Sequence, residues 1–116
     1  MTDPRTLATT YFRAWKDKDF DALRSILADD ATFRGPVGSA EDADACVEGL
    51  RGMARRTEDI TIEKMFVDGD DVLTWYELQL QGAPPLATAK WCHVEGGKIK
   101  TIRAVFDPRP VAPPGS

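Results

Sequence analysis

Side chains that could carry chemistry are few and widely spaced in this sequence. His93 is the only histidine, and Cys46 and Cys92 are the only cysteines. Zinc sites need three or four nitrogen or sulfur ligands at short spacings, and the sequence has no CxxC pair. His93 follows Cys92 directly, but strand alternation turns the two side chains to opposite faces, so no histidine or basic helix end lies beside the thiol to stabilise a thiolate. We therefore expect no metal site, no cofactor and no cysteine nucleophile.

Charge and hydropathy exclude two classes of partner. A formal net charge of -4 and a pI of 4.9 argue against nucleic acid, which requires a basic surface. No apolar run approaches the ~20 residues that span a membrane. The opening MTDPRTLATT resembles neither a secretory signal nor a transit peptide, so a cytoplasmic location with reduced thiols is expected.

Length and hydrophobic content predict one compact domain. The chain has 116 residues, of which 42% are hydrophobic. We place the domain over residues 1–108. The remaining residues 109–116, RPVAPPGS, are assigned to a proline-rich tail.

Three helices are predicted in the first half of the chain. Asp3 and Pro4 are typical of a helix start, and apolar residues follow at helical spacing: Leu7, Ala8, Tyr11, Phe12 and Trp15. Asp19 can begin a second, short helix that closes at Asp29, so that an extended segment begins at Ala31. A third helix carries Cys46, Val47, Leu50 and Met53 on one face.

The second half of the chain predicts a β-sheet. Four segments are rich in β-branched and aromatic residues and are separated by glycine-containing turn signals: ITIEKMFV, VLTWYELQL, ATAKWCHV and KIKTIRAVF. Helices followed by antiparallel strands predict an α+β fold in which the helices cover one sheet face. Alternation assigns the more uniformly apolar sets to that concave face: Val72, Tyr76, Leu78, Ala89, Trp91, Ile102, Ala104 and Phe106.

Two stretches of sequence resemble a known family. YFRAWKDKDFDALRSILADDATFRGPVG and GGKIKTIRAVFDP are similar to the SnoaL-like branch of the nuclear transport factor 2-like (NTF2-like) superfamily, over most of residues 5–108. The resemblance implies a cone, in which a strongly curved antiparallel sheet surrounds an apolar pocket closed by helices. Members include steroid isomerases, epoxide hydrolases, dehydratases and polyketide cyclases, so the fold alone assigns no activity.

The resemblance also implies a homodimer, because relatives commonly associate through the outer sheet face. The residues assigned to that interface are Trp75, Glu77, Lys90 and Arg103. An exposed tryptophan among opposite charges is typical of such a surface. A monomer with amphipathic, solvent-facing strands is the alternative.

Position by position, the acids of two related enzyme groups are absent. Tyr11 falls where ketosteroid isomerases place an oxyanion-binding tyrosine, but Gly35 stands at their general base and Ala89 at their second acid. The epoxide hydrolases resemble this chain less well at their catalytic Asp-Arg-Asp set. The three corresponding positions lie near Leu78, Tyr76 and Ala104, so none of the three catalytic residues is present. Because the proton-moving groups are missing, we expect neither reaction. Glu41 and Asp42 are close to Gly35 in sequence, but their direction does not follow from it.

The polyketide cyclases offer one partial match. They use an acid at the end of the last strand and a pocket histidine, which resemble Asp107 and His93. The resemblance makes Tyr11, His93 and Asp107 the candidate catalytic residues. Strand alternation turns Asp107 away from Phe106 unless a bulge intervenes. The plain alternatives are a core tyrosine, a half-exposed histidine and a strand-ending aspartate.

The predicted pocket suits a flat, apolar ligand that carries an oxygen. Its expected lining is Trp15, Phe33, Gly35, Met53, Tyr76, Leu78, Ala89, Trp91, Ala104 and Phe106. Two functions remain open. One is a small-molecule-binding protein with isomerase-, cyclase- or dehydratase-type chemistry, and the other is a non-catalytic ligand carrier or dimeric scaffold.

Overall fold

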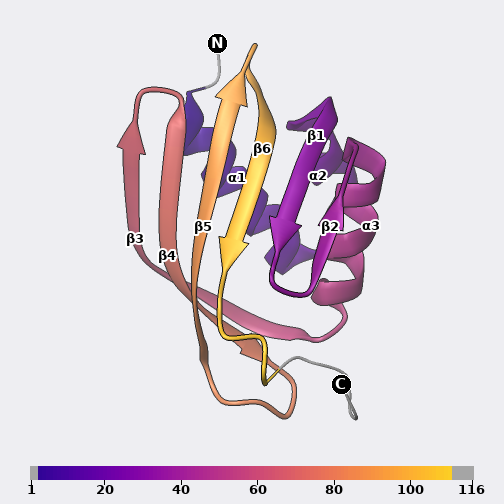
Figure 1. Ribbon diagram of the computed structural model, residues 1–116, viewed down its shortest axis with the longest axis vertical. Coiled ribbons are helices and arrows are strands. Elements are labelled where there is room, and N and C mark those ends of the chain that lie inside the picture. The colour runs from indigo at the N-terminus through magenta and orange to yellow at the C-terminus, as the bar shows by residue number, and fades with distance from the viewer. Residues whose placement is uncertain (1–2, 111–116) are drawn as a thin grey trace.

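The computed structural model describes residues 3–110. In this range two helices come before a six-stranded sheet, and a third helix lies between the second and third strands in chain order (Figure 1). The elements are α1 (Pro4–Asp17), α2 (Phe20–Ser25), β1 (Leu27–Gly35), β2 (Gly38–Ala40), α3 (Ala43–Ala54), β3 (Thr57–Asp68), β4 (Asp71–Leu80), β5 (Leu86–Glu95) and β6 (Lys98–Val105). The predicted tail lies outside the described residues from 111 onward. No helix in residues 3–110 is long and apolar enough to cross a membrane.

Each helix begins at an aspartate. The side chains of Asp3, Asp19 and Asp42 each accept a hydrogen bond from the backbone N–H three residues further on. These bonds satisfy donors that the first helical turn leaves unpaired. Lys18, in the left-handed region at φ 57°, ends α1. The predicted helix starts at Asp3 and Asp19 are therefore confirmed.

The sheet has the order β2-β1-β6-β5-β4-β3, and the helices lie on one of its faces (Figure 1). The α+β cone fold is confirmed, but one pairing differs from the antiparallel prediction, because β1 runs parallel to β6. That pairing also extends β1 back to Leu27, four residues before the predicted start. Leu27 aligns with Ile99, whose N–H donates to the carbonyl of Ile26 at 2.8 Å.

The predicted faces of β4 and β6 are confirmed, but that of β5 is wrong by one residue. In β5 the buried set is Leu86, Thr88, Lys90, Cys92 and Val94. Ala89, Trp91 and His93 therefore lie on the outer face. Register fixes this arrangement, since Lys90 is paired with the buried Thr74 and Trp91 with the exposed Leu73.

Candidate functional site

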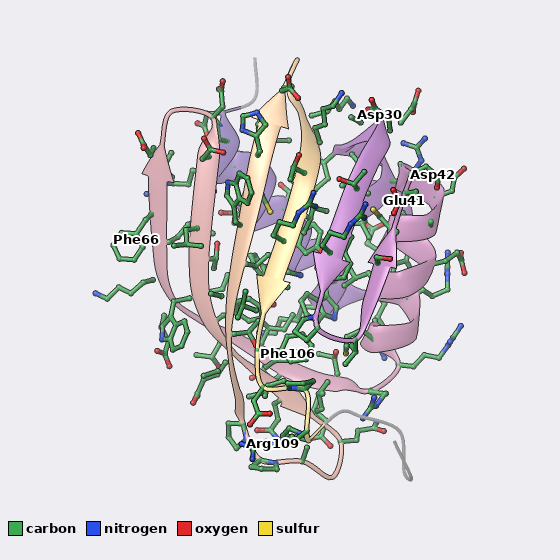
Figure 2. The ribbon with its side chains drawn as sticks, in the orientation of Figure 1. Asp30, Glu41, Asp42, Phe66, Phe106 and Arg109 are labelled. Atoms are coloured by element: carbon green, nitrogen blue, oxygen red, sulfur yellow. The ribbon has the colours of Figure 1, made fainter. Side chains whose placement is uncertain are left out.

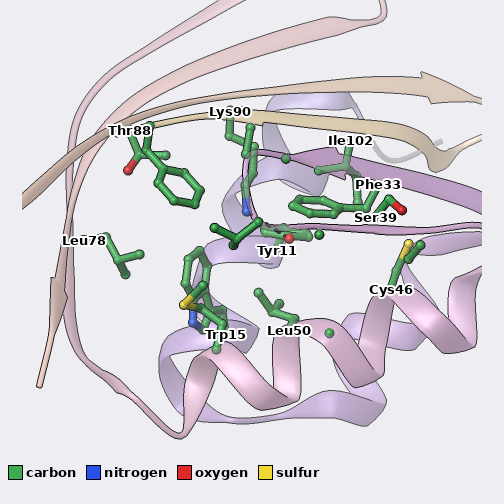
Figure 3. Close-up of a pocket in the computed structure, with 18 of the residues that line it drawn as sticks. Tyr11, Trp15, Phe33, Ser39, Cys46, Leu50, Leu78, Thr88, Lys90 and Ile102 are labelled. Atoms are coloured by element: carbon green, nitrogen blue, oxygen red, sulfur yellow. Dashed lines mark hydrogen bonds between the residues drawn. The ribbon is translucent and has the colours of Figure 1, made fainter. Parts of the chain in front are cut away.

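A cavity of about 220 Å³ lies between the concave sheet face and helices α1 and α3 (Figure 3). Its wall includes these positions that the sequence assigned to a pocket: Tyr11, Trp15, Phe33, Gly35, Met53, Tyr76, Leu78, Ala104 and Phe106. Other wall residues come from β2, α3, β5 and β6, among them Ser39, Cys46, Leu50, Thr88, Lys90 and Ile102. Ala89 and Trp91 are not on this wall, because they face outward on β5.

Lys90 is the one ionisable amine on the cavity wall, and no carboxylate lines the cavity within residues 3–110. The residue is only 3% exposed. Its Nζ donates a hydrogen bond to the Tyr11 hydroxyl at 3.0 Å. Figure 3 shows the Lys90 side chain extending from the sheet into the space above α1 and α3. A buried charge normally has an acidic partner, so this environment is unusual.

Aromatic rings replace the missing carboxylate around the Lys90 ammonium. Nζ lies 4.4 Å from the ring centre of Tyr11 and 4.6 Å from that of Trp15. Three more rings lie within 5.9 Å, those of Phe12, Phe33 and Tyr76. The negative faces of aromatic rings attract cations, and this attraction is stronger where water is excluded. The rings thus stabilise the ammonium in part, without neutralising it.

Burial lowers the pKa of Lys90 to about 8, because the charged form loses its hydration and gains no acidic partner. The same burial raises the pKa of the neighbouring Cys92 thiol to about 11 and that of Cys46 to about 11. Burial also raises the pKa of Tyr11. At neutral pH these thiols and this phenol are protonated, while roughly a tenth of Lys90 is neutral amine.

Four residues with hydroxyl groups line the cavity with Lys90, namely Tyr11, Ser39, Tyr76 and Thr88. Tyr11 accepts from Lys90, and Thr88 donates to the carbonyl of Leu86 at 3.2 Å. The Tyr76 hydroxyl has no hydrogen-bond partner among residues 3–110, and the same holds for the proton of Tyr11. The Tyr11 phenol can therefore donate to an oxygen placed beside the Lys90 ammonium.

The other two predicted catalytic residues lie away from this cavity. The Nδ1–H of His93 donates to Asp71 at 2.7 Å, and the Trp91 indole donates to the same carboxylate at 2.8 Å. These three residues form a cluster on the outer face of β4 and β5. The Asp107 carboxylate binds Arg109 at 2.6 Å, and this guanidinium lowers its pKa to about 2. The structure thus does not bring His93 or Asp107 to Tyr11.

No nearby acid replaces the carboxylate that is missing at Gly35. Glu41 forms an ion pair with Arg34 at 2.9 Å, and Asp42 caps α3 (Figure 2). A Cβ atom at Gly35 would lie 2.9 Å from the end of the Phe33 ring. The ring therefore occupies the space that a larger side chain at Gly35 would need.

Lys90 is the residue that the sequence-based interpretation missed. A signal for it exists one residue outside the segment ATAKWCHV. Counted from Leu86, a period of two gives Leu86, Thr88, Lys90, Cys92 and Val94, with apolar residues at both ends. Trp91 misdirected the assignment, because a large aromatic residue ordinarily indicates the buried face of a strand.

Comparisons with known proteins agree with the fold described above. The family model of the SnoaL-like domain matches residues 8–102. An NTF2-like protein of unknown function from Cytophaga hutchinsonii is 27% identical, with a TM-score of 0.84 over 96% of each chain. The search of curated proteins finds no match.

Two solved structures with named activities are more distant and show the fold alone. A putative ketosteroid isomerase from Kribbella flavida is 17% identical, with a TM-score of 0.80 over 97% of this chain and 83% of that one. An LEH-like epoxide hydrolase from M. tuberculosis is 21% identical, with a TM-score of 0.77 over 92% and 84%.

A curved sheet and three helices around an apolar cavity define the NTF2-like class of proteins. Within that class, the chain belongs to the SnoaL-like domain family, whose model covers most of its length.

Proposed function

We propose that this protein binds an apolar small molecule through an oxygen that accepts hydrogen bonds from Lys90 and Tyr11. The observation that carries the proposal is the buried Lys90 ammonium, which has aromatic rings and one hydroxyl around it but no carboxylate. An uncompensated charge in an apolar interior is costly. A bound anion or carbonyl oxygen would reduce that cost. Because no carboxylate on the described cavity wall pairs with Lys90, the site favours such a ligand.

The shape and lining of the cavity support a flat ligand. Aromatic side chains from α1, β1 and β4 form its wall, including Trp15, Phe33 and Tyr76. Such walls favour planar rings and long apolar groups, while a few polar groups fix orientation. Carboxylates, phenolates, enolates and ketones on a one- or two-ring skeleton meet both requirements.

Isomerase-, cyclase- or dehydratase-type chemistry is compatible with this arrangement. Lys90 and the phenols of Tyr11 and Tyr76 could stabilise negative charge on an oxygen as it develops in a transition state. Of the three candidates from the sequence, only Tyr11 enters this proposal. The acids named for the isomerases and epoxide hydrolases are absent, and no carboxylate of residues 3–110 lines the cavity.

A non-catalytic ligand carrier is the second candidate. The observation that favours it is this same absence of a carboxylate base on the described cavity wall, since proton transfer by a carboxylate needs that group within hydrogen-bond reach. A carrier would bind the ligand and release it unchanged. Turnover of a bound ligand would exclude this candidate.

We also propose that a second copy of the chain covers the outer sheet face. Two adjacent rows of paired residues there are rich in exposed apolar side chains, namely Phe66, Leu73 and Trp91 in one row and Trp75 and Val105 in the next, with the half-buried Ala89 between the last two. A contiguous apolar patch on one face is typical of an interface. Lys90, which the sequence assigned to this interface, is buried on the opposite face and takes no part.

A cytoplasmic location completes the proposal. Cys46 and Cys92 are both buried free thiols. Reduced thiols are usual in that compartment, where disulfides rarely persist.

Binding is tested by isothermal titration with a matched pair of probes, 2-naphthoate and its neutral carboxamide. At pH 7 we expect the carboxylate to bind at least about tenfold more tightly, because a charge-assisted hydrogen bond to Lys90 is stronger than a neutral one. Lys90→Met should remove this preference, whereas Lys64→Met, which changes an exposed lysine of β3, should keep it. Equal affinity of the wild type for both probes would overturn the proposal.

A further inference from the structure

We propose that Lys90 acts as a nucleophile and forms an imine with an apolar aldehyde or ketone held in the cavity. This inference rests on the ligand-binding role proposed above and adds a covalent step to it. Nothing in the family resemblance assigns a nucleophile to this position. Imine formation depends on where the amine lies, on its protonation state and on the group that moves its protons.

The position of Lys90 suits attack on a bound carbonyl. Its side chain leaves the middle of β5 and places Nζ inside the cavity, between rings from α1 and β1 (Figure 3). An apolar ligand that fills the cavity must contact this nitrogen. Surface lysines such as Lys64 have no such wall to hold a carbonyl beside them. Holding two reactants together supplies much of the rate of a reaction.

The surroundings of Lys90 also favour the nucleophilic form. An amine attacks only when it is neutral, and a lysine desolvated in an apolar pocket is an activated nucleophile. Burial lowers the pKa of Lys90 to about 8, and no carboxylate on the described cavity wall restores the charged form. Compared with a lysine of ordinary pKa near 10.5, the neutral fraction at pH 7 is about 300-fold larger.

Tyr11 is placed to move the protons of the reaction, since its hydroxyl lies 3.0 Å from Nζ. The nitrogen lone pair forms a bond to the carbonyl carbon, and the C=O electron pair moves to oxygen, which takes a proton from Tyr11. The tyrosinate then removes a proton from the new N–C centre. Tyr11, which is now protonated again, gives its proton to the hydroxyl group, and this group leaves as water while the nitrogen lone pair forms C=N. The tyrosinate then takes the remaining N–H proton, which restores Tyr11 and leaves the neutral imine. One amine and one carbonyl thus become one imine and one water, without oxidant or reductant.

Reductive trapping tests the step directly. The protein is incubated at pH 7 with 2-naphthaldehyde and sodium cyanoborohydride, and intact mass and peptide mapping follow. We expect one adduct, with the mass of the aldehyde less one oxygen, located on Lys90. Lys90→Met should remove that adduct, and Lys64→Met should keep it. Tyr11→Phe should slow its formation at least about tenfold, because the hydroxyl that moves the protons is lost.

The mapping on wild-type protein is decisive even if a variant folds poorly. Adducts spread over surface lysines, or no adduct at all, would overturn the imine proposal. If 2-naphthoate still binds in a Lys90-dependent way and no adduct forms on Lys90, the covalent step fails and the binding role stands. If neither binding nor trapping depends on Lys90, both proposals fail.

Discussion

Lys90 brings an uncompensated positive charge into an apolar interior, and this charge should set how stability depends on pH. The folded state holds the pKa at about 8, below the value near 10.5 expected in the unfolded chain. Between these values the unfolded state binds more protons, so the free energy of unfolding rises with pH. Below pH 8 both states are protonated and the full penalty of the buried charge is present.

The change Lys90→Met should therefore stabilise the protein at pH 7 and flatten its pH profile. Methionine fills similar space without a charge, and apolar replacement of a buried ion is often stabilising. From pH 7 to pH 9, the wild type should gain roughly 1 kcal/mol relative to the variant. Urea unfolding of both proteins at the two pH values measures this difference. Parallel pH profiles would contradict the buried position of Lys90.

The bond between Tyr11 and Lys90 can be isolated in a double-mutant cycle. Tyr11→Phe removes the hydroxyl that accepts from Nζ, and leaving a buried donor unpaired costs about 1–3 kcal/mol. In the Lys90→Met background the same change should cost little. Chemical denaturation of the four proteins gives the coupling energy. Tyr76→Phe, which removes a hydroxyl with no partner in residues 3–110, is the control, and a loss as large as that of Tyr11→Phe would argue against the assignment.

At this scale the sequence predicted the aromatic wall but not the amine. Tyr11 and Trp15 were found because a helical apolar stripe has one buried side. Lys90 was missed because a lone lysine beside Trp91 indicates the solvent face of a strand under ordinary burial preferences. The cost of burying this amine is only partly reduced by long-range contacts with rings from α1, which no local pattern reveals.

Among the elements, α1, α3 and β3 are held together by a short relay of hydrogen bonds. The Trp15 indole donates to the Thr57 hydroxyl at 3.1 Å, and that hydroxyl donates to the carbonyl of Met53 at 2.8 Å. Trp15 and Met53 both line the cavity. The relay thus fixes the helical wall opposite the sheet.

Thr57→Val should loosen this junction. Valine keeps the shape but removes both hydrogen bonds, so we expect a loss of about 1–2 kcal/mol in the free energy of unfolding. Thr61→Val, at an exposed position of the same strand, is the matched control and should change stability little. Thermal melts compare the two variants. Equal melting temperatures for both would mean that the relay contributes nothing.

How well each element was predicted depended on the range of the interactions that define it. The starts of α1 and α2 followed from Asp3 and Asp19, whose caps are local. The start of β1 at Leu27 did not, because it is set by parallel pairing with Ile99 on a distant strand. The face of β5 was assigned wrongly for a related reason, since pairing with β4 decides it.

On the scale of the whole molecule, the sheet separates two different apolar surfaces. The inner surface forms the cavity, and the outer one exposes Trp75 and Val105, at 43% and 70%. Phe66 extends the outer surface at the β3 edge, where its side chain points away from the sheet (Figure 2). The outer surface is the one that we propose to be covered by a second copy.

Trp75→Glu or Val105→Glu should give a monomer if that proposal is right. A buried unpaired carboxylate at each copy of the interface would be strongly unfavourable. Light scattering coupled to size-exclusion chromatography measures the mass. Ile62→Glu is the control, because Ile62 is 41% exposed but lies on the other face of β3. A monomeric wild type at micromolar concentration would contradict the dimer.

The state of Lys90 in the free protein tests the account most directly. Protein labelled with ¹³C at the lysine ε-carbons is titrated by NMR from pH 6 to pH 12, with Lys90→Met to assign the signal. We expect the Lys90 resonance to titrate with a pKa of about 8, below the ordinary value near 10.5 for a lysine in water. A Lys90 resonance that titrates at that ordinary value would place the amine in water and contradict the binding site proposed for the cavity.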